Sequence, residues 1–503
     1  MVKENDLSEK LEWRINFPDG KSKVLVPESG ILDKTWVGLK GLLGRFILMV
    51  LRFLENAWNL GVAEPKKVIH GVKVGLTLFL VSLFYYMRPL YDGLGGNAMW
   101  AIMTVVVVFE SNVGATLYKC VNRVIGTFLA GSLALGVQWI ACKSGETFEP
   151  MLVGVSVFFF ASAATFSRFI PSVKTHFDYG TMIFILTFSL VSVSGYRADE
   201  VFQLGHQRLS TIAIGTSLCI VISILIYPIW SGTELHLLIF RNLGKLADSL
   251  EGCVTEYFEE DKTVPESEKD DSKRIQGYKC VLNCKGTEES MAKLATWEPG
   301  HDRFNFRHPW KQYLKVGATM RNCAYCVEAL NSSVNSKNQA PEHLKKHLRD
   351  ACMALSSCYS DVLKELALTI ENTTKSSKID FLIGEMNFAV QELEDALKSV
   401  PNSVTEPAEL STLEAPINEA NREPVTKTTL PLIVEFLPLA TLVSLLIEIA
   451  ARVKEIANAV DQLADLAKFK LTMDEKPNQK KTTKEPTSDA QDDETTKIPQ
   501  NLR

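Results

Sequence analysis

The stretch NAMWAIMTVVVVFESNVGATLYKCVNR, residues 97–123, changes from apolar to charged within a few helical turns. It is apolar as far as Phe109, reaches Glu110, and then places Lys119 and Arg123 where the next apolar run begins. A buried strand of a soluble protein would explain residues 105–108. It would not explain cations at the start of a second long apolar segment, a pattern typical of a membrane protein.

The apolar residues of the chain are concentrated in one half. The sequence has 503 residues, of which 46 % are hydrophobic, and a formal net charge of −5. Residues 69–230 carry few charges, whereas the chain from Arg241 onward reads as soluble protein, so a mean hydropathy near zero averages two unlike halves. The length suits two or three domains. The net charge gives no indication of a nucleic-acid partner.

Six stretches of the apolar half meet or approach the length of a membrane span, which is roughly 20 apolar residues for a bilayer core about 30 Å thick. They are residues 69–87, 97–113, 121–141, 151–169, 179–195 and 209–230. The second and fifth are short, so we expect them to be tilted, shielded by protein, or longer than their apolar part. The predicted fold class is an all-α polytopic membrane protein with six transmembrane helices followed by a cytosolic helical domain.

The basic residues of the short loops predict the orientation of these spans. Bases precede the first span, separate the second from the third and the fourth from the fifth, and follow the sixth: Lys66, Lys67, Lys119, Arg123, Arg168, Lys174, Arg241 and Lys245. In the alternate loops each base is offset by an acid. By the positive-inside rule both termini are cytosolic, which requires an even number of spans.

The N-terminal region is predicted to lie on the membrane without crossing it. Residues 41–60 are apolar but interrupted by Arg45, Arg52 and Glu55, a pattern that favours an amphipathic helix in the cytosolic interface over a seventh span. Residues 1–20 lack the apolar core of a cleaved signal peptide. The ten cysteines show no spacing of a small secreted domain, which favours a reduced cytosolic face.

Charges inside the predicted spans are the main functional signal. Lys73 lies in the first span, Glu110 near the end of the second, and Arg123 and Arg208 at the starts of the third and sixth. Such residues face a bundle interior or a wet cavity, or extend to the nearest headgroups. We favour the cavity for Lys73 and Arg123, and both interpretations stay open for Lys119. Because basic rings select anions in pores, the residues predict an anion pathway.

The second half has the periodicity of amphipathic helices. A helix continues from the last span, and others are expected near residues 277–294, 313–333, 341–371 and 379–399. A long final helix opens with an apolar run, but two prolines, Glu435 and Glu448 favour packing on the cytosolic domain over a further crossing. The predicted organisation is: 1–63 N-terminal region, 64–232 membrane domain, 233–400 cytosolic helical domain, 401–429 disordered linker, 430–471 final helix, and 472–503 disordered tail.

Motifs for catalysis or metal binding are not found in the sequence. Cys323 and Cys326 lack a second cysteine pair or a spaced histidine pair, and no phosphate loop, nucleophile elbow or HExxH motif occurs. We therefore expect no enzyme activity, no cofactor and no metal. A dense aromatic and basic cluster begins at Trp297-Glu298-Pro299 and continues to Lys311. A capped turn before a helix is favoured there over an anion-sensing surface.

Several blocks of the sequence resemble the plant aluminium-activated malate transporter family of anion channels. In order along the chain they are EPKK at 64–67, GGNAMWAIMTVVVVFE at 95–110, VGATLYKCVNR at 113–123, FDYGTMIFILTFSLVSVSGYR at 177–197, QRLSTIAIG at 207–215, YPIWSGTELH at 227–236 and WEP at 297–299. The resemblance covers most of the chain, and so many blocks in the right order make chance similarity very improbable.

The resemblance implies a homodimer whose anion pathway is lined by basic residues between the subunits, in contact with lipid. Malate and other organic or inorganic anions are the implied permeants. Family positions associated with permeation map onto Lys73, Lys119, Arg123 and Arg208, and Glu110 maps onto a position that affects transport. Trp297, Glu298 and Pro299 form the family's cytosolic triplet. The resemblance leaves the plasma membrane and the vacuolar membrane both open.

Two points limit what this resemblance carries over. Many relatives read Gly-Glu-Asp-Leu-His after the last span, where this chain has Gly232-Thr233-Glu234-Leu235-His236, so regulatory ligand binding there is not expected to transfer. Aluminium activation belongs to only some members and is not predicted. The hypothesis is passive anion flow, with a proton-coupled organic-anion transporter or a non-conducting membrane scaffold as alternatives.

Overall fold

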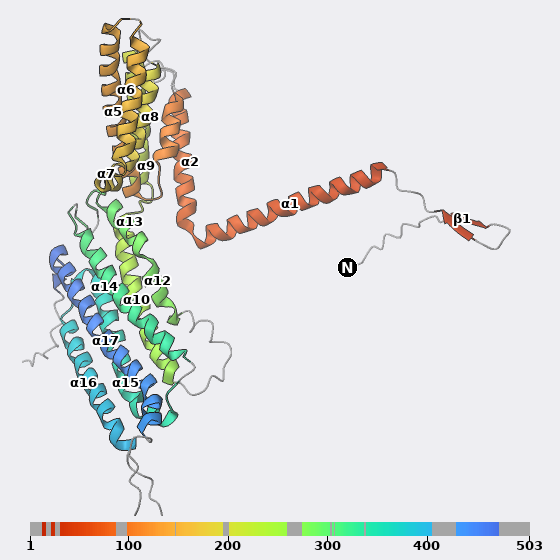
Figure 1. Ribbon diagram of the computed structural model, residues 1–503. Helices are drawn as coiled ribbons and strands as arrows, with labels where there is room; N and C mark the ends of the chain where they lie inside the picture. Colours follow the sequence, from red (N-terminus) through yellow and green to blue (C-terminus); the bar gives the residue numbers. More distant parts are fainter. Residues whose placement is uncertain are drawn as a thin grey trace, which may run out of the picture. The chain divides into compact units, whose positions relative to one another are not determined.

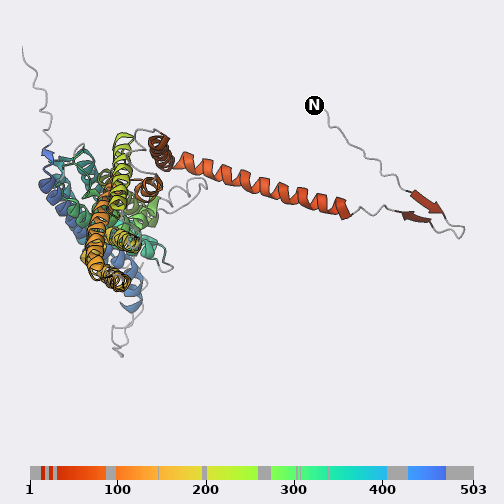
Figure 2. The same cartoon turned by 90° about the horizontal axis from the view of Figure 1, so that it is seen from above.

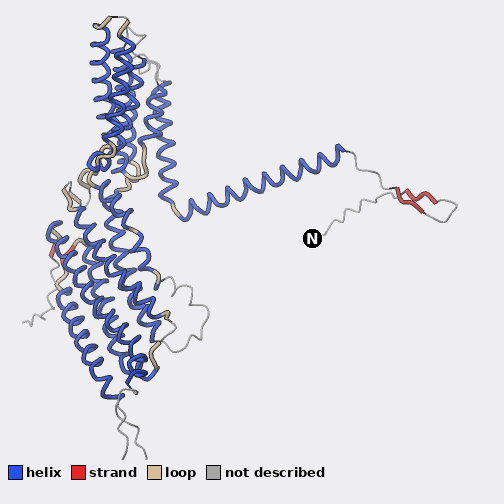
Figure 3. Tube along the Cα trace, in the orientation of Figure 1, coloured by secondary structure: helices blue, strands red, loops and turns tan. Residues whose placement is uncertain are grey.

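The computed structural model describes residues 13–16, 22–25, 31–86, 98–145, 147–194, 201–258, 274–301, 304–305, 307–336, 339–404 and 429–471. The regular secondary structure of the described residues is helical apart from four short strands, with loops and turns between the elements (Figures 1 and 3). Strand β1 (Trp13–Asn16) pairs antiparallel with β2 (Ser22–Leu25), and β3 (Thr374–Lys375) pairs parallel with β4 (Lys470–Leu471). The predicted all-α class is confirmed.

The chain packs as two units. The first comprises Met1–Ser231 and Leu294–His301, and the second comprises Gly232–Lys293 and Asp302–Arg503. A short segment far along the sequence, Leu294–His301, thus belongs to the first unit. The predicted linker beyond Val404, the predicted tail beyond Leu471, and the loops 87–97 and 195–200 lie outside the described residues.

The first unit contains the apolar helices. They are α1 (Ile31–Ala63), α2 (Pro65–Tyr86), α4 (Ala98–Val108), α5 (Val113–Lys143), α6 (Glu149–Ser167), α7 (Pro171–His176), α8 (Asp178–Ser194) and α9 (Val201–Leu225). Each of the six predicted spans corresponds to one of α2, α4, α5, α6, α8 and α9. Helices α5, α6, α8 and α9 pack alongside one another (Figures 1 and 2).

Some helices of the described chain are long and apolar enough to cross a membrane, and others are shorter. Five helical stretches among the described residues are long and apolar enough to cross a membrane: Gly41–Ala63, Pro65–Phe84, Val113–Lys143, Glu149–Ser167 and Phe436–Ala467. Helices α4, α8 and α9 hold shorter apolar stretches. The chain is therefore a membrane protein with several apolar helices, and six crossings stays a prediction.

Helix α5 is longer than the sequence indicated, because it begins at Val113 and not near residue 121. The predicted boundary followed the polar and charged residues before the apolar run. A helix can carry such residues when they lie inside a bundle, since its backbone hydrogen bonds are satisfied within the helix whatever its side chains are. Lys119 and Arg123 consequently lie on α5 itself and not in a loop before it.

Helices α5 and α8 approach each other at two glycines. A Cβ atom at Gly126 would lie 2.6 Å from the carbonyl oxygen of Gly180, and one at Gly180 would lie 2.7 Å from Oδ1 of Asn122. Only glycine allows this separation, as in many membrane helix pairs. The close contact fixes the rotation of α5 that buries Asn122 and Arg123.

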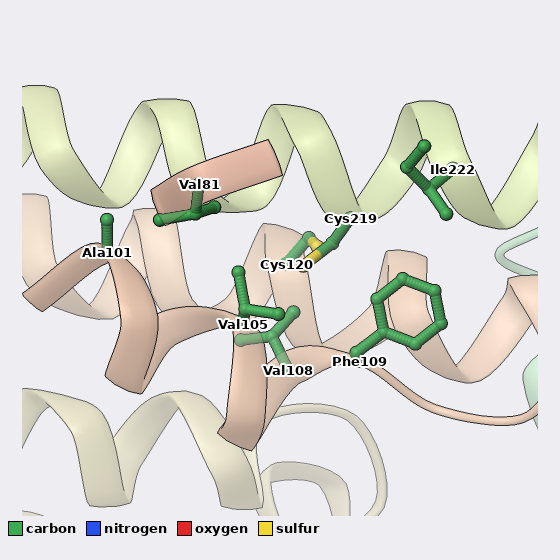
Figure 4. Packing of buried hydrophobic residues seen from close by; sticks show 8 residues of the cluster. All are labelled: Val81, Ala101, Val105, Val108, Phe109, Cys120, Cys219 and Ile222. Atoms are coloured by element: carbon green, nitrogen blue, oxygen red, sulfur yellow. The ribbon is translucent and has the colours of Figure 1, made fainter. Parts of the chain in front are cut away.

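A second contact joins α2, α4, α5 and α9. Its buried members are Val81, Ala101, Val105, Val108, Phe109, Cys120, Cys219 and Ile222. Figure 4 shows these side chains filling the space between the helices, with Cys120 and Cys219 next to each other. The apolar run 105–108, which would suit a buried strand, lies on helix α4 instead, with Val105 and Val108 packed and Val106 and Val107 exposed.

The second unit is a helical bundle. Its helices are α10 (Ser231–Phe258), α12 (Gly277–Asn283), α13 (Lys285–Ala295), α14 (Trp310–Val334), α15 (Glu342–Asn372), α16 (Lys378–Val404) and α17 (Thr429–Ala467). Leu442 and Leu446 of α17 are buried, and Tyr359 of α15 donates a hydrogen bond to the carbonyl oxygen of Leu446 at 2.5 Å. Gln312 of α14 donates to the carbonyl oxygen of Ala459. Helix α17 thus packs on α14 and α15.

Candidate functional site

Lys73 of α2 lies inside the first unit, with 1 % of its surface exposed. Its Nζ donates a hydrogen bond to the carbonyl oxygen of Tyr227 at 2.9 Å. Tyr227 follows the end of α9, precedes Pro228 and has a positive φ of 42°. Because the chain turns there, the Tyr227 carbonyl lacks the partner that a continuing helix would give it. The Lys73 ammonium supplies that partner and stays in the bundle interior.

Lys119 and Glu110 form an ion pair between α5 and the end of α4. The side chains are partly accessible, 28 % for Lys119 and 38 % for Glu110. Lys119 also donates to the carbonyl oxygen of Val107 at 3.3 Å, and its Nζ lies 5.7 Å from the ring centre of Tyr179. A cation and a carboxylate are thus held together at a partly accessible position of the first unit.

Arg123 lies one turn further along α5, on the same face as Lys119. Only 6 % of its surface is exposed, and Nη1 donates to the Tyr179 hydroxyl at 3.3 Å. Its Nε is buried and has no hydrogen-bond partner among the described residues. A guanidinium has five N–H donors. Arg123 therefore brings a buried positive charge whose one hydrogen-bond acceptor here is neutral.

The structure brings some of the predicted site residues together. Lys119 and Arg123 both lie against Tyr179 and Glu110 pairs with Lys119, whereas Lys73 is held by Tyr227. Arg208 lies on α9, but its side chain is outside the described residues. Sequence reasoning missed both tyrosines, because neither residue carries charge and no spacing links either one to a cation.

A threonine fixes the loop that carries Glu110. The backbone N–H of Glu110 donates to Oγ1 of Thr116 at 3.1 Å, and the same hydroxyl lies 3.1 Å from the carbonyl oxygen of Asn112. The N–H of Val113 donates to the carbonyl oxygen of Ile229 at 3.0 Å. The turn between α4 and α5 is thereby tied to the residues that precede α10.

The Trp297-Glu298-Pro299 triplet lies against the start of α5 and against Ser231 of the same unit. Glu298 is 2 % exposed, and its Oε1 accepts a hydrogen bond from the N–H of Ser231 at 2.5 Å. Ser231 is the first residue of α10, where a carboxylate satisfies an unpaired N–H and interacts favourably with the helix dipole. Glu298 is therefore a buried helix cap that comes from a distant part of the sequence.

Aromatic and close backbone contacts complete the docking of segment 294–301. Trp297 meets Tyr118 edge to face, with ring centres 5.4 Å apart, and His301 stacks on Trp230 at 3.9 Å. A Cβ atom at Gly114 would lie 2.5 Å from the carbonyl oxygen of Leu294 and 2.9 Å from Oε1 of Glu298. Only glycine at position 114 lets the segment lie this close to α5.

Groups that could hold a metal ion do not occur among the described residues. All ten cysteines are free thiols. In the second unit, His236 and His308 both contact the hydroxyl of Tyr313, at 2.9 and 3.3 Å. Burial and the nearby His236 lower the pKa of His308 to about 4. This cluster joins α10 to α14 as part of the core of the second unit.

Comparison with known proteins agrees with the membrane fold. Residues 58–429 match the family model described as aluminium activated malate transporter. The chain is 54 % identical to aluminum-activated malate transporter 10 of Arabidopsis thaliana over 95 % of this chain and 98 % of that protein. It is 43 % identical to transporter 2 of the same plant, over 84 % and 79 % of the two chains. Transporter 1 of Triticum aestivum is 40 % identical, over 82 % and 85 %. The chain belongs to the aluminium-activated malate transporter family.

Proposed function

We propose that this protein is an anion channel that passes malate and other small organic or inorganic anions across a membrane. The names of its relatives support malate as a permeant. The observation that carries the proposal is Arg123, a buried guanidinium on an apolar helix whose hydrogen-bond acceptor is the neutral hydroxyl of Tyr179. This arrangement supports a role as a transporter and not as an enzyme.

The charges of the site favour an anion. The candidate residues include three cations, Lys73, Lys119 and Arg123, and one carboxylate, Glu110, which pairs with Lys119, so positive charge is in excess. An uncompensated buried charge is costly, and a passing carboxylate relieves that cost. Low-dielectric walls strengthen the long-range attraction and raise the local concentration of anions. The residues therefore concentrate dicarboxylates without a tight bidentate clamp, which would hinder release.

Glu110 sets the strength of binding in this proposal. In the absence of a permeant anion, the Glu110 carboxylate is paired with the Lys119 ammonium. A carboxylate of malate arriving at Lys119 has to compete with it. The permeant therefore binds more weakly than it would to a free ammonium, which keeps its release fast.

The wider assembly is part of the same proposal. Six spans with both termini in the cytosol follow from the distribution of basic residues in the loops. The pathway lies between the subunits of a homodimer, and Lys73 and Arg208 contribute to its positive potential. The membrane is the plasma membrane or the vacuolar membrane.

The test is electrical recording of variants that remove one positive charge each. Arg123→Gln and Lys119→Gln are expected to reduce malate current at least tenfold and severalfold, respectively, because a fixed attractive charge is lost. Lys174→Gln is the matched control, since Lys174 is exposed on α7. Wild-type current in Arg123→Gln, or an equal loss in Lys174→Gln, would contradict the assignment.

A proton-coupled transporter is the second candidate, and one observation favours it. Nδ1 of His70 is buried without a hydrogen-bond partner among the described residues. The centre of the His70 ring lies 5.9 Å from that of Phe109, the residue that precedes Glu110 in the sequence. Coupling predicts a reversal potential that shifts with the pH gradient at constant anion gradient. A non-conducting scaffold predicts no flux at all into liposomes. A reversal potential set by the anion gradient alone excludes both.

A further inference from the structure

Helix α1 exposes a long apolar surface within the described residues of the first unit. Over Gly41–Ala63 no residue is buried. The large apolar side chains exposed there are Leu42, Leu43, Phe46, Ile47, Leu48, Met49, Val50, Leu51, Phe53, Leu54, Trp58, Leu60 and Val62. A continuous apolar surface of this size marks a contact with a partner or a membrane.

The polar residues of this stretch lie in one narrow stripe. Arg45 and Arg52 are seven residues apart, which places them on the same line of the helix, two turns from each other. Asn56 and Asn59 lie within about 40° of that line, and Glu55 lies about 80° around the helix from Arg45. The remaining circumference of the helix is apolar. An apolar sector much wider than half the circumference favours a deep position in a bilayer over a contact with one flat protein surface.

The C-terminal end of α1 lies where the first predicted span begins. Glu64 separates α1 from α2, and Lys67 near the start of α2 pairs with Glu64 at 2.8 Å. The chain is close-packed at this junction, since a Cβ atom at Gly61 would lie 3.3 Å from Val68. Because α2 begins with two lysines and then becomes apolar, its start marks a bilayer surface. Helix α1 therefore ends at that surface.

We infer that α1 is a lipid-binding helix that lies in the cytosolic leaflet, with Arg45 and Arg52 on the headgroups of acidic phospholipids. The guanidinium group matches a phosphate with two parallel hydrogen bonds. Crossing the bilayer would bring both arginines into hydrocarbon, where no described residue pairs with either. A position along the interface places both arginines at the headgroups and the apolar sector in the hydrocarbon. This inference does not depend on anion conduction.

The test is lipid binding by the full-length protein, measured by native mass spectrometry with phosphatidylserine and phosphatidylcholine. Arg45→Gln/Arg52→Gln is expected to weaken phosphatidylserine binding about thirtyfold, roughly fivefold for each charge, and to leave phosphatidylcholine binding unchanged. Arg45→Lys/Arg52→Lys keeps the charge but loses the paired hydrogen bonds, and is expected to weaken phosphatidylserine binding less than the glutamine variant does. The control is Arg274→Gln/Arg349→Gln, which removes two exposed arginines of the second unit.

Equal phosphatidylserine binding by the glutamine variant and the control would overturn the inference. A second measurement distinguishes the occupants of the apolar sector. A photoreactive amino acid at Phe53 in nanodiscs is expected to form adducts with phospholipid. Adducts with a second copy of the chain, or an N-terminus accessible only from the side opposite the C-terminus, would also overturn the inference.

Discussion

The ion pair of Lys119 with Glu110 joins two partly exposed side chains of the site. Both were identifiable from the sequence, because charges inside apolar segments are rare and stand out. Their pairing was not, since nine residues and a turn separate them. The turn is set by the Thr116 hydroxyl, and nothing in the sequence marks that hydrogen bond. The charged residues of the site can thus be predicted from the sequence, whereas their positions relative to one another depend on uncharged neighbours such as Thr116.

Glu110→Gln is predicted to strengthen malate binding. The variant removes the carboxylate that competes for Lys119, so the apparent affinity for malate should rise severalfold and the maximal current should fall because release slows. Current measured against malate concentration tests this. Glu328→Gln removes an exposed carboxylate from α14 and should change neither quantity. An unchanged affinity in Glu110→Gln would exclude the competition.

Tyr179→Phe is predicted to change anion selectivity while largely preserving current. The variant removes the hydroxyl that accepts from Arg123 but keeps the ring beside Lys119. Arg123 then has more free donors for the permeant, so malate should be favoured over chloride more strongly than in the wild type. Reversal potentials in malate and chloride mixtures measure the ratio. Tyr325→Phe, on an exposed tyrosine, is the control.

Segment 294–301 packs on the first turn of α5 and bonds to Ser231, all within the first unit. Sequence periodicity placed most helices well, but it began α5 too late and gave no reason to connect Glu298 with Ser231. The position of segment 294–301 depends on the buried carboxylate of Glu298, the stacked ring of His301 and the missing side chain at Gly114. None of these has a periodic signature, so a contact between distant segments could not be read from the sequence.

Gly114→Ala is predicted to displace segment 294–301. The added methyl group would meet the carbonyl oxygen of Leu294 at 2.5 Å, a separation that neither backbone can accept. A lower melting temperature and reduced malate current should follow. Gly131→Ala is a matched control on the same helix, because a Cβ atom there meets nothing within 4 Å. That variant should be neutral or slightly stabilising, since alanine favours helix over glycine. Equal behaviour of the two variants would contradict the docking.

Glu298→Ala is predicted to destabilise the protein by about 1–3 kcal/mol, the usual cost of leaving a buried donor unpaired. The unpaired donor is the backbone N–H of Ser231. Glu298→Gln keeps an oxygen acceptor for the Ser231 N–H and loses the negative charge, so its cost should be smaller. Thermal unfolding of the purified protein ranks the three chains. A glutamine variant as unstable as the alanine variant would show that the charge, and not the hydrogen bond, dominates.

At the scale of the whole molecule, the chain divides close to the point where its composition changes. The predicted membrane domain ends at residue 232, and the first unit ends at Ser231 apart from its later segment. Apolar length and charge reveal such a division because the bilayer and water impose different compositions. The cytosolic location of the second unit, the interfacial position of α1, the six crossings and the homodimer remain predictions.

The second unit should lose stability in mild acid. Burial, and then His236, lower the pKa of His308 to about 4, whereas an unfolded histidine titrates near 6.5. As the pH falls from about 6.5 to about 4, the unfolded state takes up a proton that the folded state resists, so the free energy of unfolding decreases. His308→Gln should flatten this part of the profile, and His343→Gln, on an exposed histidine, should not. Unfolding measured across this pH range tests the difference.

The central claim is that fixed positive charge inside the first unit selects anions. The most direct measurement is the reversal potential of purified protein in planar bilayers under a malate gradient, for the wild type and for Arg123→Glu. The wild-type potential should follow the malate gradient, and the charge-reversed variant should lose malate selectivity while keeping its fold. A variant that conducts malate with wild-type selectivity would contradict the account.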